Sequence, residues 1–124
     1  MGQQRTRLQE LRTRQEPDRD ARLELLRLAM QLEPGTDLRA DLAAFNAVYP
    51  ADAPGLYTEA LARLDKDERE GLALLERAME IDADAIKPAC ERAYAYLCKR
   101  KETGLAEEYA ERWRRQDALE GGRG

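Results

Sequence analysis

The residue types able to do chemistry in this chain are carboxylates, arginines, tyrosines and two cysteines. The 124 residues include no histidine, and no serine occurs in the sequence. Serine hydrolases need a hydroxyl nucleophile beside an imidazole base, and zinc hydrolases usually hold their metal through imidazole nitrogens. The composition argues against both classes and predicts that the chain is not an enzyme. A metal-dependent enzyme that uses carboxylates is the remaining catalytic alternative.

The densest group of carboxylates is Asp65, Asp67, Glu68 and Glu70. Its spacing lacks the central glycine and the acid at the twelfth position that a calcium-binding EF-hand loop requires. Carboxylates at the start of a helix are stabilised by the helix dipole, and Asp67 followed by Glu70 has the form of a capping box. The cluster therefore predicts a helix start near Asp67, with no metal and no cofactor.

The two cysteines, Cys90 and Cys98, fall in one predicted helix. At this spacing their α-carbons are ~12 Å apart, which is too far for a disulfide bond. We expect both to be small apolar residues of the core in a chain from a reducing compartment.

The charge balance bears on partners and location. Lys and Arg number 21 against 25 Asp and Glu, a formal net charge of −4, and acids are interleaved with the arginines of residues 5–14 and 112–115. Nucleic-acid binding is not expected of such an acidic chain. No run of residues has the length and apolarity of a membrane span or a secretory signal. The sequence thus predicts no membrane insertion and a cytoplasmic location.

The elements that must position these residues are predicted to be helices. Val48, Ile81 and Ile86 are the β-branched aliphatic residues, whereas leucine and alanine are abundant, a composition that favours helix over strand. Apolar residues recur at intervals of three and four between proline, glycine and aspartate breaks. Short connections then favour antiparallel neighbours. The pattern predicts helices over residues 3–16, 20–33, 37–48, 57–65, 67–81, 86–97 and from 103 onward, with Trp113 in the core.

Two internal repeats suggest a duplicated helical unit. Residues 22–33 align with residues 71–82 with five identities in twelve, and the sequence Gly-Leu-Ala at residues 71–73 recurs 33 residues later at residues 104–106. A period near 33 residues is typical of proteins built from repeated helix pairs.

The repeated segments resemble those of tetratricopeptide-repeat (TPR) proteins, in which the second helix of each unit ends in Ala-Leu-Glu-Leu-Asp-Pro. Ala-Met-Gln-Leu-Glu-Pro at residues 29–34 and Ala-Met-Glu-Ile-Asp-Ala at residues 78–83 are both similar to that ending. Ala93 followed by Tyr96 is similar to the small and aromatic pair of a first helix. The resemblance implies an all-α fold, a short TPR-like α-solenoid of stacked antiparallel hairpins with six to seven helices in total.

The resemblance also divides the chain. It is stronger over residues 67–116 than over residues 18–66, where the longer repeat spacing indicates an additional helix at 37–48. We expect an N-terminal helical extension over residues 1–17, a TPR-like domain over residues 18–119 and a disordered tail over residues 120–124. Residues 61–113 also resemble the helical tails of some bacterial membrane-bound zinc metalloproteases, although the catalytic His-Glu-x-x-His motif has no counterpart in this sequence.

These features predict a non-catalytic module that binds another protein or a second copy of itself, or serves as a scaffold. An accessory domain of a membrane-protease-like system is the alternative. Tyr94 and Tyr96 lie about 200° apart around a helix; the repeat pattern assigns Tyr96 to the core, which leaves Tyr94 as a partner-contact residue. Arg7, Leu8 and Leu11 are further contact candidates, because their segment is too poor in apolar residues for the core alone to explain them.

Overall fold

The computed structural model describes residues 2–121. Within them the chain forms seven α-helices and one 3₁₀ turn and no β-strand, so the predicted all-α class is confirmed. None of these helices is long and apolar enough to cross a membrane. The elements are α1 (Gly2–Thr13), α2 (Arg19–Leu32), α3 (Arg39–Val48), α4 (Ala53–Asp65), α5 (Glu70–Ile81), η1 (Ala83–Ala85), α6 (Ile86–Lys99) and α7 (Thr103–Gly121).

Side-chain caps fix where α2 and α4 begin. Asp18 precedes α2 and accepts a hydrogen bond from the amide of Ala21 at 2.8 Å. Asp52 precedes α4 and accepts one from the amide of Gly55 at 2.9 Å, and Pro54 stands in the first turn, where its missing N–H costs little. Each cap satisfies an amide that has no partner within its own helix.

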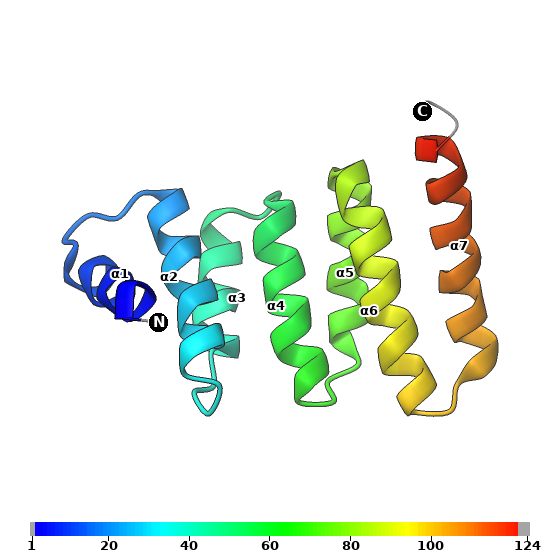
Figure 1. The fold of residues 1–124 in the computed structure, drawn as a ribbon, viewed down its shortest axis with the longest axis horizontal. Helices are drawn as coiled ribbons and strands as arrows, with labels where there is room; N and C mark the ends of the chain where they lie inside the picture. The colour runs from blue at the N-terminus through cyan, green and yellow to red at the C-terminus, as the bar shows by residue number, and fades with distance from the viewer. Residues whose placement is uncertain (1, 122–124) are drawn as a thin grey trace.

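Two antiparallel helix pairs form the C-terminal part of the molecule, α4 with α5 and α6 with α7 (Figure 1). α4 begins at Ala53 and α6 at Ile86, while α5 begins at Glu70 and α7 at Thr103, so both helices of the second pair start 33 residues after their counterparts. The repeat period in the sequence is therefore also the period of these helices.

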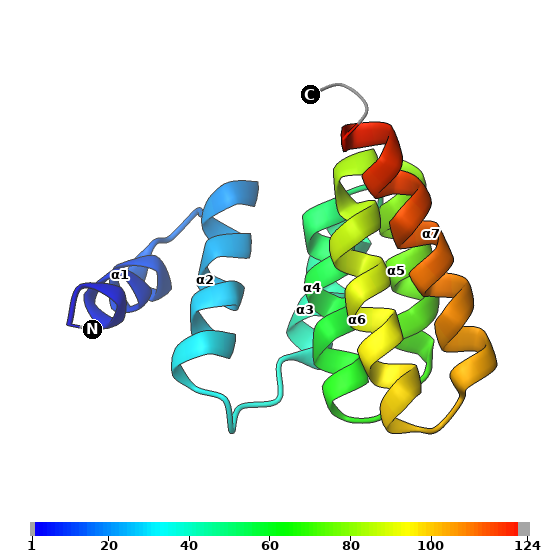
Figure 2. The ribbon, with the colours of Figure 1, turned by 45° about the vertical axis from the view of Figure 1, so that its right-hand side comes forward.

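The N-terminal helices are arranged differently. α1 is drawn nearly end-on in Figure 1 while α2 runs along the page, so the two helices cross steeply. They are not the antiparallel neighbours that the short connection predicted. α2 stands at one side of the remaining helices, with α3 as its nearest neighbour after α1 (Figure 2). The first two helices thus add to the molecule through α2, which is the main packing partner of α1.

Buried side chains gather in two main clusters. Alanines and Cys90 let the helices of the C-terminal pairs approach closely, and leucines and tyrosines fill the remaining space: Ala60, Leu72, Leu75, Met79, Ala89, Cys90, Ala93, Tyr96, Leu97, Ala106 and Tyr109. The second cluster joins α1, α2, α3 and α4 through larger side chains: Leu8, Leu23, Leu26, Ala29, Leu38, Leu42, Phe45 and Ala62. Trp113, expected in the core, is only partly buried against the first cluster.

The capping box predicted at Asp67 is wrong. Asp67 has a left-handed backbone (φ 57°) in the turn between α4 and α5, and α5 begins three residues later, at Glu70. Its carboxylate instead accepts hydrogen bonds from the Tyr96 hydroxyl at 2.7 Å and from Arg100 at 2.6 Å. Asp67 therefore links the turn of the first helix pair to the first helix of the second pair.

Two predicted boundaries also differ. α1 ends at Thr13, short of the expected Glu16. The tail expected to be disordered from residue 120 begins as helix, because α7 continues through Glu120 and Gly121. Glu120 is held by Gln116 at 3.0 Å and by Lys87 at 3.4 Å. The rest of that predicted tail, residues 122–124, lies outside the described residues.

The two glycines of the repeated segment provide a matched test of helix packing. A β-carbon at Gly71 would lie 2.7 Å from Leu64 Cγ and 2.9 Å from the carbonyl oxygen of Ala60, whereas one at Gly104 would meet nothing within 4 Å. We expect Gly71→Ala to destabilise the fold by about 1–3 kcal/mol. Gly104→Ala should leave stability unchanged or raise it by up to about 1 kcal/mol. Urea unfolding measures both, and equal effects would contradict the close approach of α5 to α4.

Candidate functional site

Of the candidate contact residues of α1, the two leucines lie inside the molecule and Arg7 is partly exposed. Leu8 is 3% exposed and Leu11 is 1% exposed. Arg7 donates two hydrogen bonds of 2.8 Å to the carboxylate of Glu24 in α2. The prediction that Leu8 and Leu11 form a contact surface is therefore corrected, because both leucines cover an apolar face of α2. Ion pairs of Arg7 with Glu24 and of Arg12 with Glu33 hold the rest of α1 against α2.

The two tyrosines of α6 face opposite ways, as predicted. Tyr96 is 9% exposed and Tyr94 is 42% exposed. The neighbouring Cys98 thiol raises the pKa of Tyr94, so the phenol is neutral at pH 7. The burial of Tyr96 and the exposure of Tyr94 are confirmed, while a partner contact at Tyr94 stays a prediction.

Tyr94 borders a groove between α6 and α7. Its volume is about 400 Å³, and its walls combine aromatic, small and charged side chains: Cys90, Glu91, Tyr94, Ala110, Trp113 and Arg114. The indole Nε1 of Trp113 donates a hydrogen bond to Glu91 at 3.2 Å across this groove. We call this surface the α6–α7 groove.

A second candidate surface lies where α2, α4 and α6 face one another, and we call it the α2–α4–α6 groove. One pocket of about 320 Å³ has an apolar floor that includes Met30, Leu38 and Leu61, with Lys66 and Arg92 at its rim. A smaller pocket of about 200 Å³ is lined by the same three helices, through Arg27, Tyr57 and Pro88 among others. In Figure 1 α2, α4 and α6 follow one another across the molecule, and Figure 2 shows α2 set apart from the other two.

Three cations of this groove are not neutralised within the chain. In the described part of the structure Arg27, Lys66 and Arg92 take part in no ion pair, although most arginines of the chain do. Lys66 is close enough to Asp37 to contribute to the lowered pKa of that carboxyl, after the larger effect of the Arg39 side chain. The groove therefore places these cations beside apolar surface, although the carboxylates Asp65, Asp82 and Asp84 also line its two pockets.

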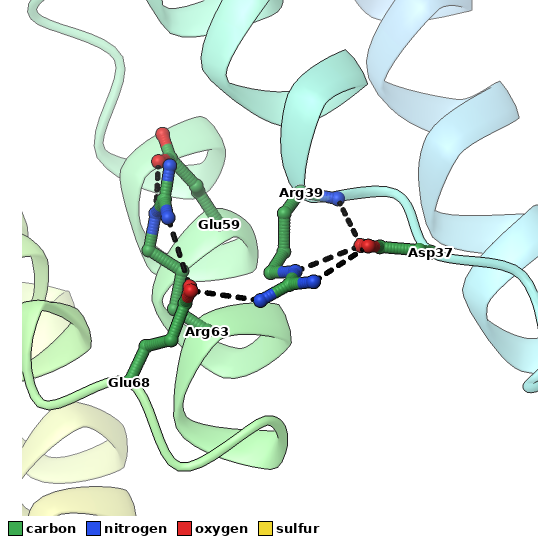
Figure 3. A network of polar contacts seen from close by, with 5 residues as sticks. All are labelled: Asp37, Arg39, Glu59, Arg63 and Glu68. Atoms are coloured by element: carbon green, nitrogen blue, oxygen red, sulfur yellow. Dashed lines mark hydrogen bonds and ion pairs between the residues drawn. The ribbon is translucent and has the colours of Figure 1, made fainter.

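A network of ion pairs (Figure 3) reaches this groove through Asp37 and Arg39, which line its larger pocket. Arg39, in the first turn of α3, donates to Asp37 and to Glu68, each at 2.7 Å. Glu68 also accepts from Arg63 at 2.9 Å, and Arg63 in turn donates to Glu59 at 2.6 Å. The network thereby connects the α2–α3 loop, α3, α4 and the turn before α5.

The inner end of the network is buried. Glu59 is 5% exposed, and its carboxylate accepts a hydrogen bond from the Asn46 amide at 2.9 Å besides the one from Arg63. Asn46 also donates to the carbonyl of Gly55 at 3.1 Å, and among the described residues its own Oδ1 has no hydrogen-bond partner. A buried carboxylate needs such partners, because an unpaired charge in the interior is costly.

Arg19 and Asp52 fix α2 relative to α4. Arg19, the first residue of α2, donates from Nη2 to Asp52 Oδ1 at 2.6 Å and from Nε to the second carboxylate oxygen. Asp52 is the residue that caps α4. The Arg19 hydrogen bond lowers the pKa of Asp52 below its ordinary value. This two-point contact joins the start of α2 to the start of α4.

The two cysteines differ in burial, and the side chains of the acid cluster diverge. Cys90 is buried, which raises the pKa of its thiol, whereas Cys98 is exposed, contrary to the expectation that both are core residues. Asp65, Asp67, Glu68 and Glu70 diverge in the structure, since Asp67 and Glu68 bond to different arginines. Across residues 2–121 no three metal-ligating side chains come together.

Comparison with family models, with curated proteins and with solved structures finds no match to this chain. What the two grooves can bind therefore follows from the side chains that line them. Sequence analysis identified Tyr94 but missed Lys66 and Arg92. The signal for Arg92 was its position four residues after Pro88, on the side of α6 away from the buried Ala93 and Leu97.

The Arg19–Asp52 contact gives a prediction about α2. Asp52→Asn keeps an oxygen that can cap α4 but removes the charge, and hydrogen bonds to charged groups contribute about 1.5–3 kcal/mol. We expect faster amide hydrogen exchange in α2 with α5 little changed. Asp20→Asn is the matched control, because Asp20 also pairs with Arg19 but is 85% exposed. Equal loss of protection in the two variants would contradict a special role of Asp52.

The same contact predicts the direction of the pH dependence. Because folding lowers the pKa of Asp52 below the ordinary value of an aspartate, about 3.9, its ionised form contributes stability above that pH, and the contribution is lost as pH falls through the folded pKa. Protection of α2 amides in the wild type should therefore decrease as the pH is lowered below about 4. Asp52→Asn should show a smaller decrease, and an identical pH profile would count against this contact.

Proposed function

We propose that this chain is a non-catalytic, TPR-like helical-repeat module that binds a segment of another protein in the α2–α4–α6 groove. Solenoids of helix pairs present extended surfaces between neighbouring repeats, and these surfaces serve in binding. The two antiparallel pairs with a common 33-residue period support assignment to this class. The two thiols, which form no disulfide, support a cytoplasmic location.

The observation that carries this proposal is the larger pocket of the groove. Its lining combines apolar side chains, among them Met30, Leu38 and Leu61, with the carboxylates Asp37 and Asp65 and the cations Lys66 and Arg92. Lys66 and Arg92 form no ion pair in the described structure, which leaves them free for a partner. Apolar pockets with a few charged groups at the rim are typical of binding sites. Such a pocket fits an apolar side chain of the partner, with a nearby carboxylate facing the two cations.

The wall of the pocket is held in place before any partner binds. Arg39 lines the pocket and is fixed by Asp37 and Glu68, and the α4 side of the wall is fixed through Arg63 and the buried Glu59 (Figure 3). Binding to such a surface requires little ordering of the module itself, which favours affinity.

A capture experiment with matched variants tests the proposal. The immobilised chain is exposed to lysate of its source cells, and retained proteins are identified by mass spectrometry for the wild type, Arg92→Glu and Arg115→Glu. Arg115 is exposed on α7, away from the groove. We expect a protein that the wild type and Arg115→Glu retain and that Arg92→Glu loses, because a carboxylate at the rim repels the acidic side chain of the partner.

Direct binding then checks the groove itself. The captured protein is titrated against the wild type and Leu61→Ala, and we expect affinity to fall by roughly tenfold or more on loss of the apolar floor. Proteins that bind all variants equally would contradict the proposed groove.

A further inference from the structure

We propose that the α6–α7 groove binds a lysine or arginine side chain presented by a basic segment of a partner protein. This inference rests on the proposed function, since it requires a protein partner, but it concerns a separate surface from the α2–α4–α6 groove. The ring faces, the distribution of charge and the depth of the groove each support it.

Aromatic rings face the groove from both helices. Tyr94 on α6 is 42% exposed, and the partly buried indole of Trp113 on α7 forms another part of the wall. The face of an aromatic ring attracts a cation, and tryptophan does so most strongly. This chain already uses that attraction, because Lys87 Nζ lies 4.7 Å from the centroid of the Trp113 ring.

Glu91 supplies the counter-charge. Its carboxylate lines the groove and accepts a hydrogen bond from Trp113 Nε1, and in the described structure it pairs with no cation. An incoming ammonium or guanidinium group can therefore contact the Tyr94 ring and the Glu91 carboxylate together. A charged hydrogen bond of this kind is stronger than a neutral one.

The cations around the groove are already neutralised. Arg114 pairs with Glu107 at 2.5 Å and with Glu111 at 3.3 Å. Lys87 pairs with Asp117 at 2.7 Å and with Glu120 at 3.4 Å. Because each cation is matched by two carboxylates, and Glu91 adds a further negative charge, this surface attracts a basic segment and repels an acidic one.

The groove also has room for the stem of a long side chain. Its volume is about 400 Å³, and small side chains, Ala110 and the buried Cys90, form part of its lining. Lysine and arginine place their methylene stems along apolar surface while the charged head contacts polar groups. A short acidic side chain would be repelled by the Glu91 carboxylate and would lack the methylene stem that packs on this apolar surface.

A second copy of this chain is a poorer occupant. Its net charge is −4, so two copies repel each other at a surface that is itself acidic. The arginines nearest its N-terminus, which could act as a basic segment, are largely engaged: Arg7 with Glu24 and Arg12 with Glu33. We therefore assign the groove to a different protein.

Trp113 gives a direct readout, because it is the single tryptophan of the chain. The probe is a pentapeptide without aromatic residues, acetyl-Ala-Leu-Arg-Leu-Ala-amide, together with the same peptide carrying neutral citrulline in place of arginine. We expect the arginine peptide to change the Trp113 emission saturably at low salt, with a weaker response at about 0.5 M salt. The citrulline peptide should produce no saturable change.

Variants locate the contact. Tyr94→Ala and Glu91→Gln should each weaken binding of the arginine peptide by roughly tenfold. Asp41→Asn is the matched control and should bind as the wild type does, because it removes an exposed carboxylate on α3, at the far side of the molecule from α7 (Figure 1). Circular dichroism confirms that each variant is folded.

Specific outcomes would overturn the inference. These are a citrulline peptide that binds as well as the arginine peptide, an unchanged affinity in Glu91→Gln, or sedimentation of the chain as a dimer that the peptide dissociates. The last outcome would assign the groove to self-association. Failure of this experiment leaves the α2–α4–α6 groove unaffected, because Arg92→Glu and Leu61→Ala test that surface alone.

Discussion

The carboxylate of Glu59 imposes the constraint on which much of the architecture depends. It is buried at the contact of α3 with α4, where an ionised group is tolerated only if it is paired and hydrogen-bonded. Asn46 supplies one partner from α3 and Arg63 supplies another from α4. Arg63 in turn requires Glu68, and Glu68 binds Arg39. Satisfying one buried charge therefore fixes two helices, the turn before α5 and the start of α3.

The two halves of the molecule differ in how closely their helices pack. In the C-terminal pairs, small residues such as Ala60, Gly71 and Ala93 bring backbones close, and dispersion over a closely packed interface does most of the stabilising. Further contacts, such as those of Tyr109 and Arg112 with Glu76, join α5 to α7. Ion pairs between partly exposed groups join helices in both halves, for example Arg7 with Glu24 and Arg112 with Glu76; such pairs contribute little and weaken in salt. The helices of the N-terminal half pack less extensively against their neighbours than those of the C-terminal pairs do. Local opening is thus expected first at α1 and α2.

Features that depend on periodicity could be predicted from the sequence. The positions of most helices followed from the spacing of leucines and from proline breaks, and the opposite faces of Tyr94 and Tyr96 followed from 3.6 residues per turn. Contacts between distant residues do not follow from such local rules. The spacing of Asp67 and Glu70 predicts a capping box, but the hydrogen-bond donors to Asp67 are Tyr96 and Arg100, about 30 positions away in the sequence. Leu8 and Leu11 were wrongly predicted to contact a partner, because the sequence of α1 alone does not show that an apolar face of α2 covers them.

The charged groups without an ion-pair partner inside the chain indicate preferences for partners that the overall composition does not show. An acidic chain in which most arginines bind carboxylates of the same molecule offers little net field to a partner at long range, so recognition depends on the groups left without a counter-ion. At the α2–α4–α6 groove these include the cations Lys66 and Arg92 together with Asp65, and at the α6–α7 groove Glu91 is an anion. The two proposals assign an acidic side chain to the first groove and a basic one to the second, so under them two partners, or two parts of one partner, bind without competing.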